Sequence, residues 1–166
     1  MGIYAKILQD SITGIYRTNA ANKILQFINR IRNESDVNQA RRFLIELMQN
    51  ARDLAYKKPD GTPEPVSIRI RLSDTELEFS HNGKVFSVKD ILSIIYQVSS
   101  KKPGEGIGQF GTGFMSTYQL SERVELTSYL KNDDNPYLPF TVCLDRSGLN
   151  KEEILDAIQE ELQQKG

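Results

Sequence analysis

The sequence predicts an α/β (α+β) protein built as a two-layer sandwich, in which helices pack on a mixed β-sheet. Three observations favour this class. Two segments with apolar residues at helical spacing come first, and short strands of alternating polarity follow them. The length of 166 residues, with 39% hydrophobic and 26% charged, suits a single hydrophobic core. We therefore expect one domain over residues 1–166.

Apolar residues spaced three and four apart predict a helix over residues 20–32. Its apolar face consists of Ile24, Phe27, Ile28 and Ile31. A second helix is expected over 37–56, where Asp36 provides the N-cap and Gln39 is placed for a capping box. A Lys-Pro-Asp-Gly turn at 58–61 ends this helix. Its core stripe is expected to contain Ala40, Leu44, Leu47, Met48, Ala51 and Leu54.

The rest of the chain alternates strands with helices. Strands are expected over 66–72, 76–80, 123–129 and 140–144, with a turn at 73–75 between the first two. Helices are expected over 88–96, 110–118 and 150–164, and loops over 99–109 and 132–139. The last helix has an apolar stripe of Ile154, Leu155, Ile158 and Leu162.

The charge and cysteine content indicate which partners and setting to expect. With 21 basic and 22 acidic residues the net charge is -1, which gives no reason to expect nucleic acid or an anionic membrane. No apolar stretch is long enough to span a membrane. The single cysteine, Cys143, rules out an internal disulfide and fits a reducing, cytoplasmic setting. Because Val142 and Leu144 flank it, we expect a buried structural thiol.

The two ends of the chain suggest the N-terminal part of a longer protein. Residues 1–19 form an extension that is either a swapped strand or a helix contacting a second copy, and the sequence leaves both interpretations open. Residues 150–166 are expected to form a helix that leads into a further region.

One face of the second helix carries polar groups where packing does not need them. Glu46, Asn50 and Asp53 are spaced by four and three residues, so they share one line beside the core stripe. One interpretation is a solvated helix edge. The other is a metal–nucleotide site, where Asn50 is an oxygen ligand to Mg²⁺ and Glu46 activates a water. The helix alone does not decide between them.

The glycine-rich loop over 99–114 favours the nucleotide site. Its glycines allow backbone N–H groups to turn toward an anion, and the start of a helix adds a positive dipole end. These glycines are Gly104, Gly106, Gly108, Gly111 and Gly113. Lys101 and Lys102 either add charge to the site or are a solvated pair. The loop also contains a G-x-G-x-x-G pattern, but no buried strand precedes it, which disfavours a dinucleotide-binding enzyme.

Three segments of the chain resemble motifs of the ninety-kilodalton heat-shock chaperones, which are GHKL-type ATPases. The sequence Ile-Gly-Gln-Phe-Gly-Thr-Gly-Phe at 107–114 resembles their second glycine box. Glu-Leu-Met-Gln-Asn-Ala-Arg-Asp at 46–53 resembles their helix box, and Ser-His-Asn-Gly-Lys-Val-Phe at 80–86 resembles their first glycine box. The motifs occur in the family order and cover about residues 40–130.

The resemblance implies the Bergerat ATP-binding fold, with helices on one face of a mixed sheet, and a site for ATP, ADP and Mg²⁺. Glu46 resembles the general base for hydrolysis, Asn50 the Mg²⁺ ligand and Asp53 a supporting carboxylate. Gly83 resembles the glycine that lets the base approach the backbone. Residues 99–106 would form a lid over bound nucleotide. The other expected nucleotide contacts are His81, Asn82, Ser99, Ser100, Lys101, Gly108, Gln109, Phe110, Gly111, Gly113 and Phe114.

Two departures from the family pattern qualify this expectation. His81 replaces an aspartate that accepts a hydrogen bond from adenine, so a changed base preference or a weaker affinity is expected. A neutral histidine accepts one hydrogen bond, whereas a protonated one only donates. The family's further Gly-Thr strand and its catalytic arginine from the next domain have no counterpart here, so hydrolysis by this chain is expected to be slow.

Three functions therefore compete. The first is a chaperone-like ATPase domain in which nucleotide drives a conformational change, with a homodimer formed through the full-length protein. The second is a degenerate nucleotide-binding or scaffold module without hydrolysis, against which the intact Glu46 and Asn50 count. The third is a histidine kinase, which is disfavoured because the only histidine, His81, lies in a loop rather than on a helix.

Overall fold

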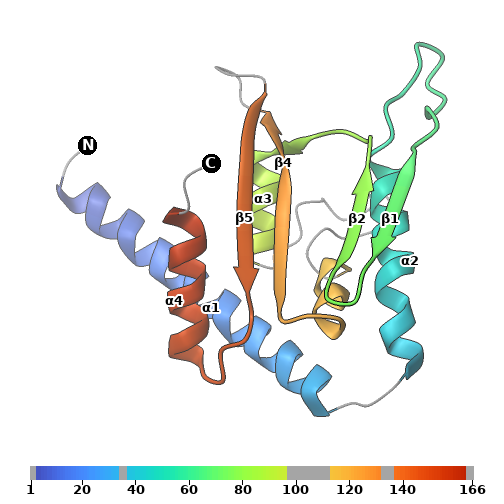
Figure 1. Cartoon of the computed structure of the whole chain (residues 1–166). Coiled ribbons are helices and arrows are strands. Elements are labelled where there is room, and N and C mark those ends of the chain that lie inside the picture. The colour runs from blue at the N-terminus through green and yellow to red at the C-terminus, as the bar shows by residue number, and fades with distance from the viewer. Residues whose placement is uncertain (1–2, 34–36, 97–112, 132–136, 164–166) are drawn as a thin grey trace.

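The computed structural model describes residues 3–33, 37–96, 113–131 and 137–163 (Figure 1). It is a mixed helix and strand structure, as the sequence predicts. The helices are α1 (Ile3–Asn33), α2 (Val37–Asp53), α3 (Val88–Tyr96), the 3₁₀ helix η1 (Phe114–Gln119) and α4 (Lys151–Gln163). The strands are β1 (Ile68–Leu72), β2 (Leu77–His81), β3 (Phe86–Ser87), β4 (Arg123–Lys131) and β5 (Leu138–Asp145).

The described strands form two small sheets rather than the single sheet that was expected. β1 and β2 make an antiparallel hairpin of their own. The second sheet has the order β3-β4-β5, with β3 parallel and β5 antiparallel to β4. The short parallel strand β3 was not predicted, since two residues carry no alternating pattern to detect. The two sheets therefore do not share one continuous face on which the helices could pack.

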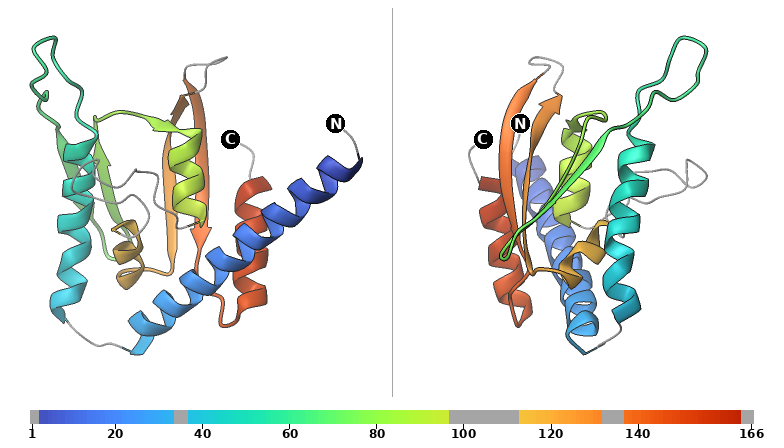
Figure 2. Two further views of the ribbon diagram at one scale, coloured as in Figure 1. Left: turned by 180° about the vertical axis from the view of Figure 1, so that it is seen from behind. Right: turned by 45° about the vertical axis from the view of Figure 1, so that its right-hand side comes forward.

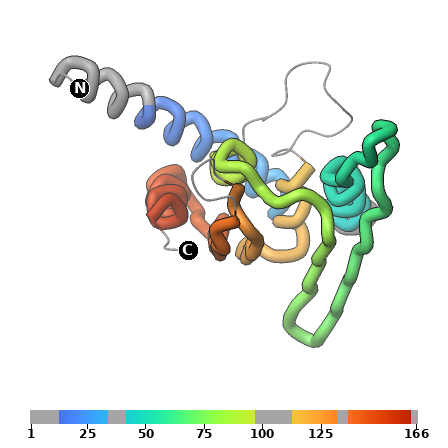
Figure 3. Tube along the Cα trace, turned by 90° about the horizontal axis from the view of Figure 1, so that it is seen from above, coloured from blue at the N-terminus to red at the C-terminus, as the bar shows by residue number. Residues whose placement is uncertain are grey.

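Helices lie on one face of the β3-β4-β5 sheet (Figures 2 and 3). Along β4, Val124 and Leu126 are half-buried, whereas Glu125 and Thr127 on the opposite face are exposed. One cluster of buried side chains joins the helices to β5. Its members are Ala20, Ala21, Ile24, Ile28, Ile94, Ile95, Phe114, Met115, Tyr118, Val142, Leu144, Ile154 and Ile158.

The first helix is longer than predicted. Its apolar face is confirmed, because Ile24 and Ile28 are buried and Phe27 and Ile31 pack beside them. The helix begins at Ile3 instead of residue 20. Residues 3–19 contain one glycine and no proline, so nothing in the backbone interrupts the helix. Of the two interpretations of this extension, the strand is wrong.

Side-chain caps explain where α3 and α4 begin. Asp90 accepts a hydrogen bond from the Ser87 backbone N–H at 2.9 Å, and the Ser87 hydroxyl oxygen accepts one from the Asp90 N–H at 3.2 Å. At the start of α4 the Asn150 side-chain oxygen accepts a hydrogen bond from the Glu153 backbone N–H at 3.0 Å, and the Asn150 side-chain amide donates one to the Glu153 carboxylate at 2.8 Å. The apolar stripe of α4 is confirmed, with Ile154 and Ile158 fully buried. The Asp36 cap proposed for α2 lies outside the described residues.

Several predicted boundaries are corrected. α2 ends at Asp53, three residues before the predicted end at 56. In the turn that follows, Gly61 has a φ of 84°. Of the helix expected over 110–118, the described part is the 3₁₀ helix η1, which begins at Phe114. β5 extends over part of the expected loop at 132–139. Among the described residues, no helix combines the length and apolar character needed to cross a membrane.

Cys143 is exposed, so the prediction of a buried thiol is wrong. Along β5 successive side chains point to opposite faces. Val142 and Leu144 face the helices and are buried, which places Cys143 on the open face. The apolar neighbours that suggested burial are therefore the reason for its exposure.

Candidate functional site

The polar line on α2 lies at the border between core and solvent. Glu46 and Asn50 are half-buried, and Asp53 is exposed. Ala51, on the neighbouring stripe, is fully buried, and η1 packs against α2. Met48 was assigned to the core stripe but is 38% exposed, which is a correction. The helix thus presents a carboxylate and an amide that are partly shielded from water.

The loop with the sequence His-Asn-Gly closes onto the C-terminal end of α2. The Lys84 backbone N–H donates a hydrogen bond to the Leu54 carbonyl oxygen at 2.8 Å. A Cβ added at Gly83 would lie 3.1 Å from the Leu54 oxygen and 3.0 Å from His81 Nδ1. Glycine is needed here because the loop approaches the helix closely, not because of an unusual φ. This contact joins the first glycine box to the helix box.

His81 ends β2 and is half-buried. Its Nδ1 accepts a hydrogen bond from the Gly83 backbone N–H at 3.1 Å. Its ring meets the Phe79 ring edge to face, with 6.3 Å between the ring centroids. Burial lowers the pKa of His81 below its ordinary value of 6.5, so the neutral ring is favoured.

Asn82 has a structural role that the sequence did not suggest. Its side-chain oxygen accepts a hydrogen bond from the Ser67 N–H at 2.8 Å, and its own N–H donates to the Ser67 oxygen at 3.3 Å. These two bonds continue the β1–β2 hairpin by one further pair and hold the loop in place. Sequence reasoning missed this pairing because Ser67 contributes only its backbone N–H and carbonyl oxygen, which every residue except proline has.

The second glycine box is described only at its end. Gly113 is half-buried and directly precedes η1, and its carbonyl oxygen accepts a hydrogen bond from the Ser116 hydroxyl at 2.6 Å. Phe114 is 7% exposed and meets Tyr118 edge to face, so its side chain belongs to the core. The other predicted residues of the lid and its hinge lie outside the described residues: Ser99, Ser100, Lys101, Gly108, Gln109, Phe110 and Gly111.

The side chains on α2 suit a magnesium ion that is carried by phosphates. Among the described residues, His, Cys, Asp and Glu form no group of three that would hold a metal by themselves. Mg²⁺ bound to a nucleotide keeps waters and phosphate oxygens as ligands and needs few from the protein. The half-buried Asn50 offers one neutral oxygen, and Glu46 lies one turn away on the same face.

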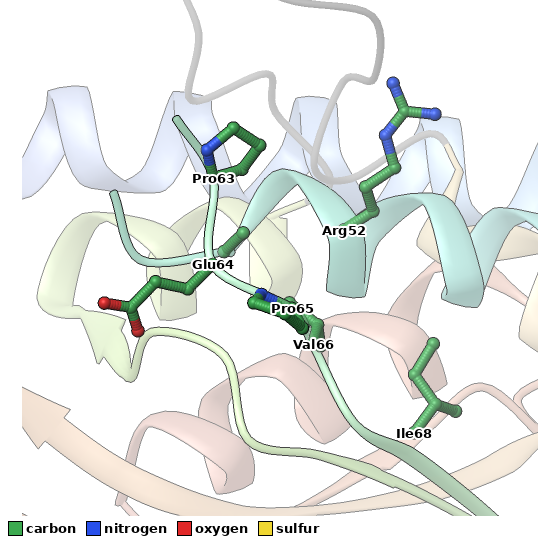
Figure 4. Close-up of a pocket in the computed structure, with 7 residues that line it drawn as sticks. Arg52, Pro63, Glu64, Pro65, Val66 and Ile68 are labelled. Carbon is green, nitrogen blue, oxygen red and sulfur yellow. The ribbon is translucent and has the colours of Figure 1, made fainter. Parts of the chain in front are cut away.

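A pocket of about 360 Å³ lies on a different side of α2 (Figure 4). Arg52 comes from the helix, and Pro63, Glu64, Pro65 and Val66 come from the segment before β1. Arg52 is about 160° around the helix from Asn50, at 100° per residue, and Ala55 lies beyond the end of α2 at Asp53. This pocket is therefore separate from the polar line of Glu46 and Asn50.

The structure is that of a mixed α and β protein, and the sequence is similar to those of chaperones. It is 28% identical over 170 aligned positions to the chaperone protein HtpG of Campylobacter jejuni subsp. doylei, covering 94% of this chain and 25% of the relative. The HtpG of Campylobacter jejuni strain RM1221 matches equally, at 28%. For the HtpG of Sulfurovum sp. strain NBC37-1 the identity is 24% over 121 positions, or 58% of this chain and 20% of the relative.

The chain spans about a quarter of the length of the curated relatives that it matches over most of its own length. No protein-family model matches it, and no solved structure does. The similarity thus supports a chaperone-related protein.

Proposed function

We propose that this chain is a nucleotide-binding domain of the Bergerat type, which binds Mg-ATP and hydrolyses it slowly. Bound nucleotide would close the glycine-rich segment over the site and change the conformation of a longer, cytoplasmic, chaperone-like protein that pairs with a second copy. The similarity to HtpG chaperones supports the chaperone-related part of this proposal.

The observation that carries the proposal is the contact between the His-Asn-Gly loop and α2. Two segments that are about 30 residues apart in the sequence meet at Leu54, one turn beyond Asn50. The third segment enters through η1, which packs on the same helix. The close approach leaves no room for a side chain at position 83, since a Cβ added at Gly83 would lie 3.1 Å from the Leu54 carbonyl oxygen.

The expected chemistry is attack of water on the γ-phosphorus of ATP. Glu46 would accept the proton of this water as the new P–O bond forms, and the bond to the ADP oxygen would break. Asn50 would hold Mg²⁺, which neutralises charge on the phosphate oxygens when it is bound. Because the family's catalytic arginine comes from the next domain, turnover by the 166-residue chain alone is expected to be slow.

Binding is tested by titration calorimetry of the 166-residue chain with Mg-ATP. We expect saturable binding that is lost in Asn50→Ala. The matched control is Gln49→Ala, because Gln49 is exposed and adjacent on the same helix. Equal loss in both variants would indicate a general effect on α2, and no binding to the unmodified chain would favour a scaffold module.

Hydrolysis is tested by single-turnover release of phosphate. We expect Glu46→Ala to lower the rate by about 10²- to 10⁴-fold, the usual contribution of a general base. Nucleotide affinity should change little, because Glu46 acts on water rather than on ATP. An unchanged hydrolysis rate in Glu46→Ala would remove this residue from the mechanism.

A further inference from the structure

The outer edge of β1 carries backbone hydrogen-bonding groups that β2 does not use. In an antiparallel pair, residues alternate between those that bond to the neighbouring strand and those whose N–H and carbonyl groups point away from it. The Ser73 N–H donates to the Glu76 oxygen at 2.9 Å, so the odd-numbered positions of β1 face β2. Ile68, Ile70 and Leu72 therefore direct their backbone groups outward. Within the described ranges, β2 is the one strand that pairs with β1.

The same three residues form an exposed apolar row, because alternate side chains share one face of a strand. Ile68, Ile70 and Leu72 are 38%, 43% and 78% exposed, so the row becomes more open toward the turn. Their neighbours Leu77 and Phe79 on β2 are half-buried. Figure 1 shows β1 on the side of the hairpin away from β4. An open edge with an apolar face is a template for the addition of a further strand.

The opposite face of β1 determines which charges an added strand can carry. Arg69 and Arg71 lie on this face, and both are exposed. Arg71 is paired with Glu78 at 3.2 Å, whereas the residue opposite Arg69 on β2 is Ser80. A strand added at the outer edge would place two of its own residues directly beside these arginines. Acidic residues are favoured there, and basic residues are disfavoured.

A second copy of β1 fits this edge poorly. Two copies related by a two-fold axis would pair in antiparallel orientation, and only residues that point outward can bond to each other. Pairing Ile70 with Ile70 satisfies this condition, but it sets Arg69 of one copy opposite Arg71 of the other. Registers shifted by two residues also set one arginine opposite another. Like charges directly opposite each other are destabilising, so a different chain with acidic residues is the better partner.

The pocket beside α2 lies where this edge begins. Ile68 is the first residue of β1 and also lines the pocket, together with Pro63, Pro65 and Val66 (Figure 4). Arg52 of α2 contributes to the lining and β2 does not, so the pocket is on the outer side of β1. An added strand that runs antiparallel to β1 would therefore end with an apolar side chain close to apolar pocket residues.

We propose that β1 is a docking edge for an extended segment of another protein, in which apolar residues alternate with acidic residues. The segment adds as an antiparallel strand, with its apolar side chains beside the row of Ile68, Ile70 and Leu72. Its carboxylates lie beside Arg69 and Arg71. Backbone hydrogen bonds provide the affinity, and the alternating side chains provide the specificity. The docking needs no nucleotide, so it stands apart from the proposed function.

The probe for this site is the peptide Glu-Val-Glu-Val-Glu-Val-Glu, amidated at its C-terminus and labelled with fluorescein at its N-terminus. Fluorescence anisotropy follows its titration with the 166-residue chain. We expect saturable binding that weakens as salt is added. The peptide Lys-Val-Lys-Val-Lys-Val-Lys should bind at least about tenfold more weakly, because it sets basic residues beside the arginines. No binding of the acidic peptide, or equal binding of both, would overturn the proposal.

Methylation of single peptide nitrogens tests whether the probe adds as a strand. In antiparallel addition the valine N–H groups point toward β1, and the glutamate N–H groups point away from it. A methyl group on the nitrogen of the central valine should therefore lower the affinity at least about tenfold. A methyl group on the nitrogen of the next glutamate should change it far less. Equal affinities of the two methylated peptides would contradict strand addition.

Variants of the chain locate the contact. Arg69→Glu should weaken binding of the acidic peptide about tenfold, whereas Lys89→Glu, the same charge change at an exposed position on α3, should leave it nearly unchanged. Circular dichroism checks that both variants fold. Equal weakening by both would show attraction by net charge alone and overturn the proposal. Sedimentation of the unmodified chain tests for a second copy: a dimer that dissociates in Ile70→Asp, without peptide binding, would assign the edge to self-association instead.

Discussion

The two ends of the molecule are built differently. Where α1, α4 and β5 meet, large apolar side chains are fully enclosed, and Ile24, Ile154 and Ile158 are each 0% exposed. In the β1–β2 hairpin beside α2, Ile70 is 43% and Leu72 78% exposed. Hydrophobic burial is the main source of stability. The enclosed end therefore contributes more to the stability of the fold than the hairpin does.

A buried ion pair is the clearest mark of the enclosed end. Arg146 follows β5 and Glu161 lies on α4, and both side chains are at most 1% exposed. The guanidinium donates to both carboxylate oxygens, with Nη2 3.0 Å from Oε2, and also reaches the Ile95 carbonyl oxygen at 3.4 Å. It lies over the Tyr118 ring, 5.8 Å from the centroid. The pair therefore joins α4, α3 and η1.

Breaking this pair should have the largest effect on stability. In Glu161→Ala the Arg146 charge stays buried without its carboxylate, and we expect a loss of about 3–5 kcal/mol in the free energy of unfolding. Urea denaturation followed by circular dichroism measures the loss. A change below about 1 kcal/mol would mean that water or a rearranged side chain replaces the carboxylate.

The control for this prediction removes both charges. The double variant Arg146→Met with Glu161→Leu replaces the ion pair with apolar groups of similar length, and such replacements are often neutral or stabilising. We expect it to recover most of the stability that Glu161→Ala loses. If it does not, packing rather than the unpaired charge accounts for the loss.

A matched pair of isoleucines compares the two ends directly. Ile158→Ala removes a side chain that is 0% exposed and should cost about 2–5 kcal/mol in unfolding free energy. Ile70→Ala removes a side chain that is 43% exposed, so about 1 kcal/mol or less is expected. Equal losses would show that the hairpin is covered in solution by a surface absent from this structure.

This contrast explains which features the sequence could predict. The apolar stripes of α1 and α4 could be predicted, because burial leaves a direct pattern at helical spacing. The separation into two sheets could not, since alternation identifies strands but not their partners. Cys143 was misjudged because its neighbours were counted instead of its place in the alternation.

The candidate site was predictable in part, because residues on one helix face leave a pattern in the sequence. Glu46 and Asn50 could be proposed as candidates because polar groups beside a core stripe are conspicuous at helical spacing. Leu54 was missed as a contact of the glycine loop, because it uses its backbone carbonyl, which every residue has. The hydrogen bond between His81 and Gly83 depends on side-chain orientation, which residue spacing does not contain.

A smaller effect is expected at the contact between the loop and α2. In Gly83→Ala the new methyl group would meet the Leu54 carbonyl at 3.1 Å and His81 Nδ1 at 3.0 Å. The loop has to shift by a few tenths of an ångström, which should cost about 1 kcal/mol in unfolding free energy. The ring should also lose its bond to Gly83, so the NMR signals of His81 should move. Unchanged signals would show that the helix end yields instead of the loop.

The smallest expected effect is a pH dependence from His81. Burial lowers its pKa in the folded chain below 6.5, so at acid pH the unfolded chain binds more protons at this site. The contribution of His81 to stability is therefore complete above about pH 6.5 and is lost as the pH falls through the folded pKa. Protonation of Nδ1 would also set a donor against the Gly83 N–H.

His81→Asn is the matched variant for this measurement. The asparagine oxygen can accept the same N–H two residues on, as in an Asx-turn, but it does not titrate. The difference in unfolding free energy between the unmodified chain and His81→Asn cancels the other titrating groups, which both proteins share. We expect this difference to turn against the unmodified chain as the pH falls below about 6.5. A shift in the opposite direction would mean that an acceptor faces the ring and raises its pKa, which would also contradict a ring held neutral by burial.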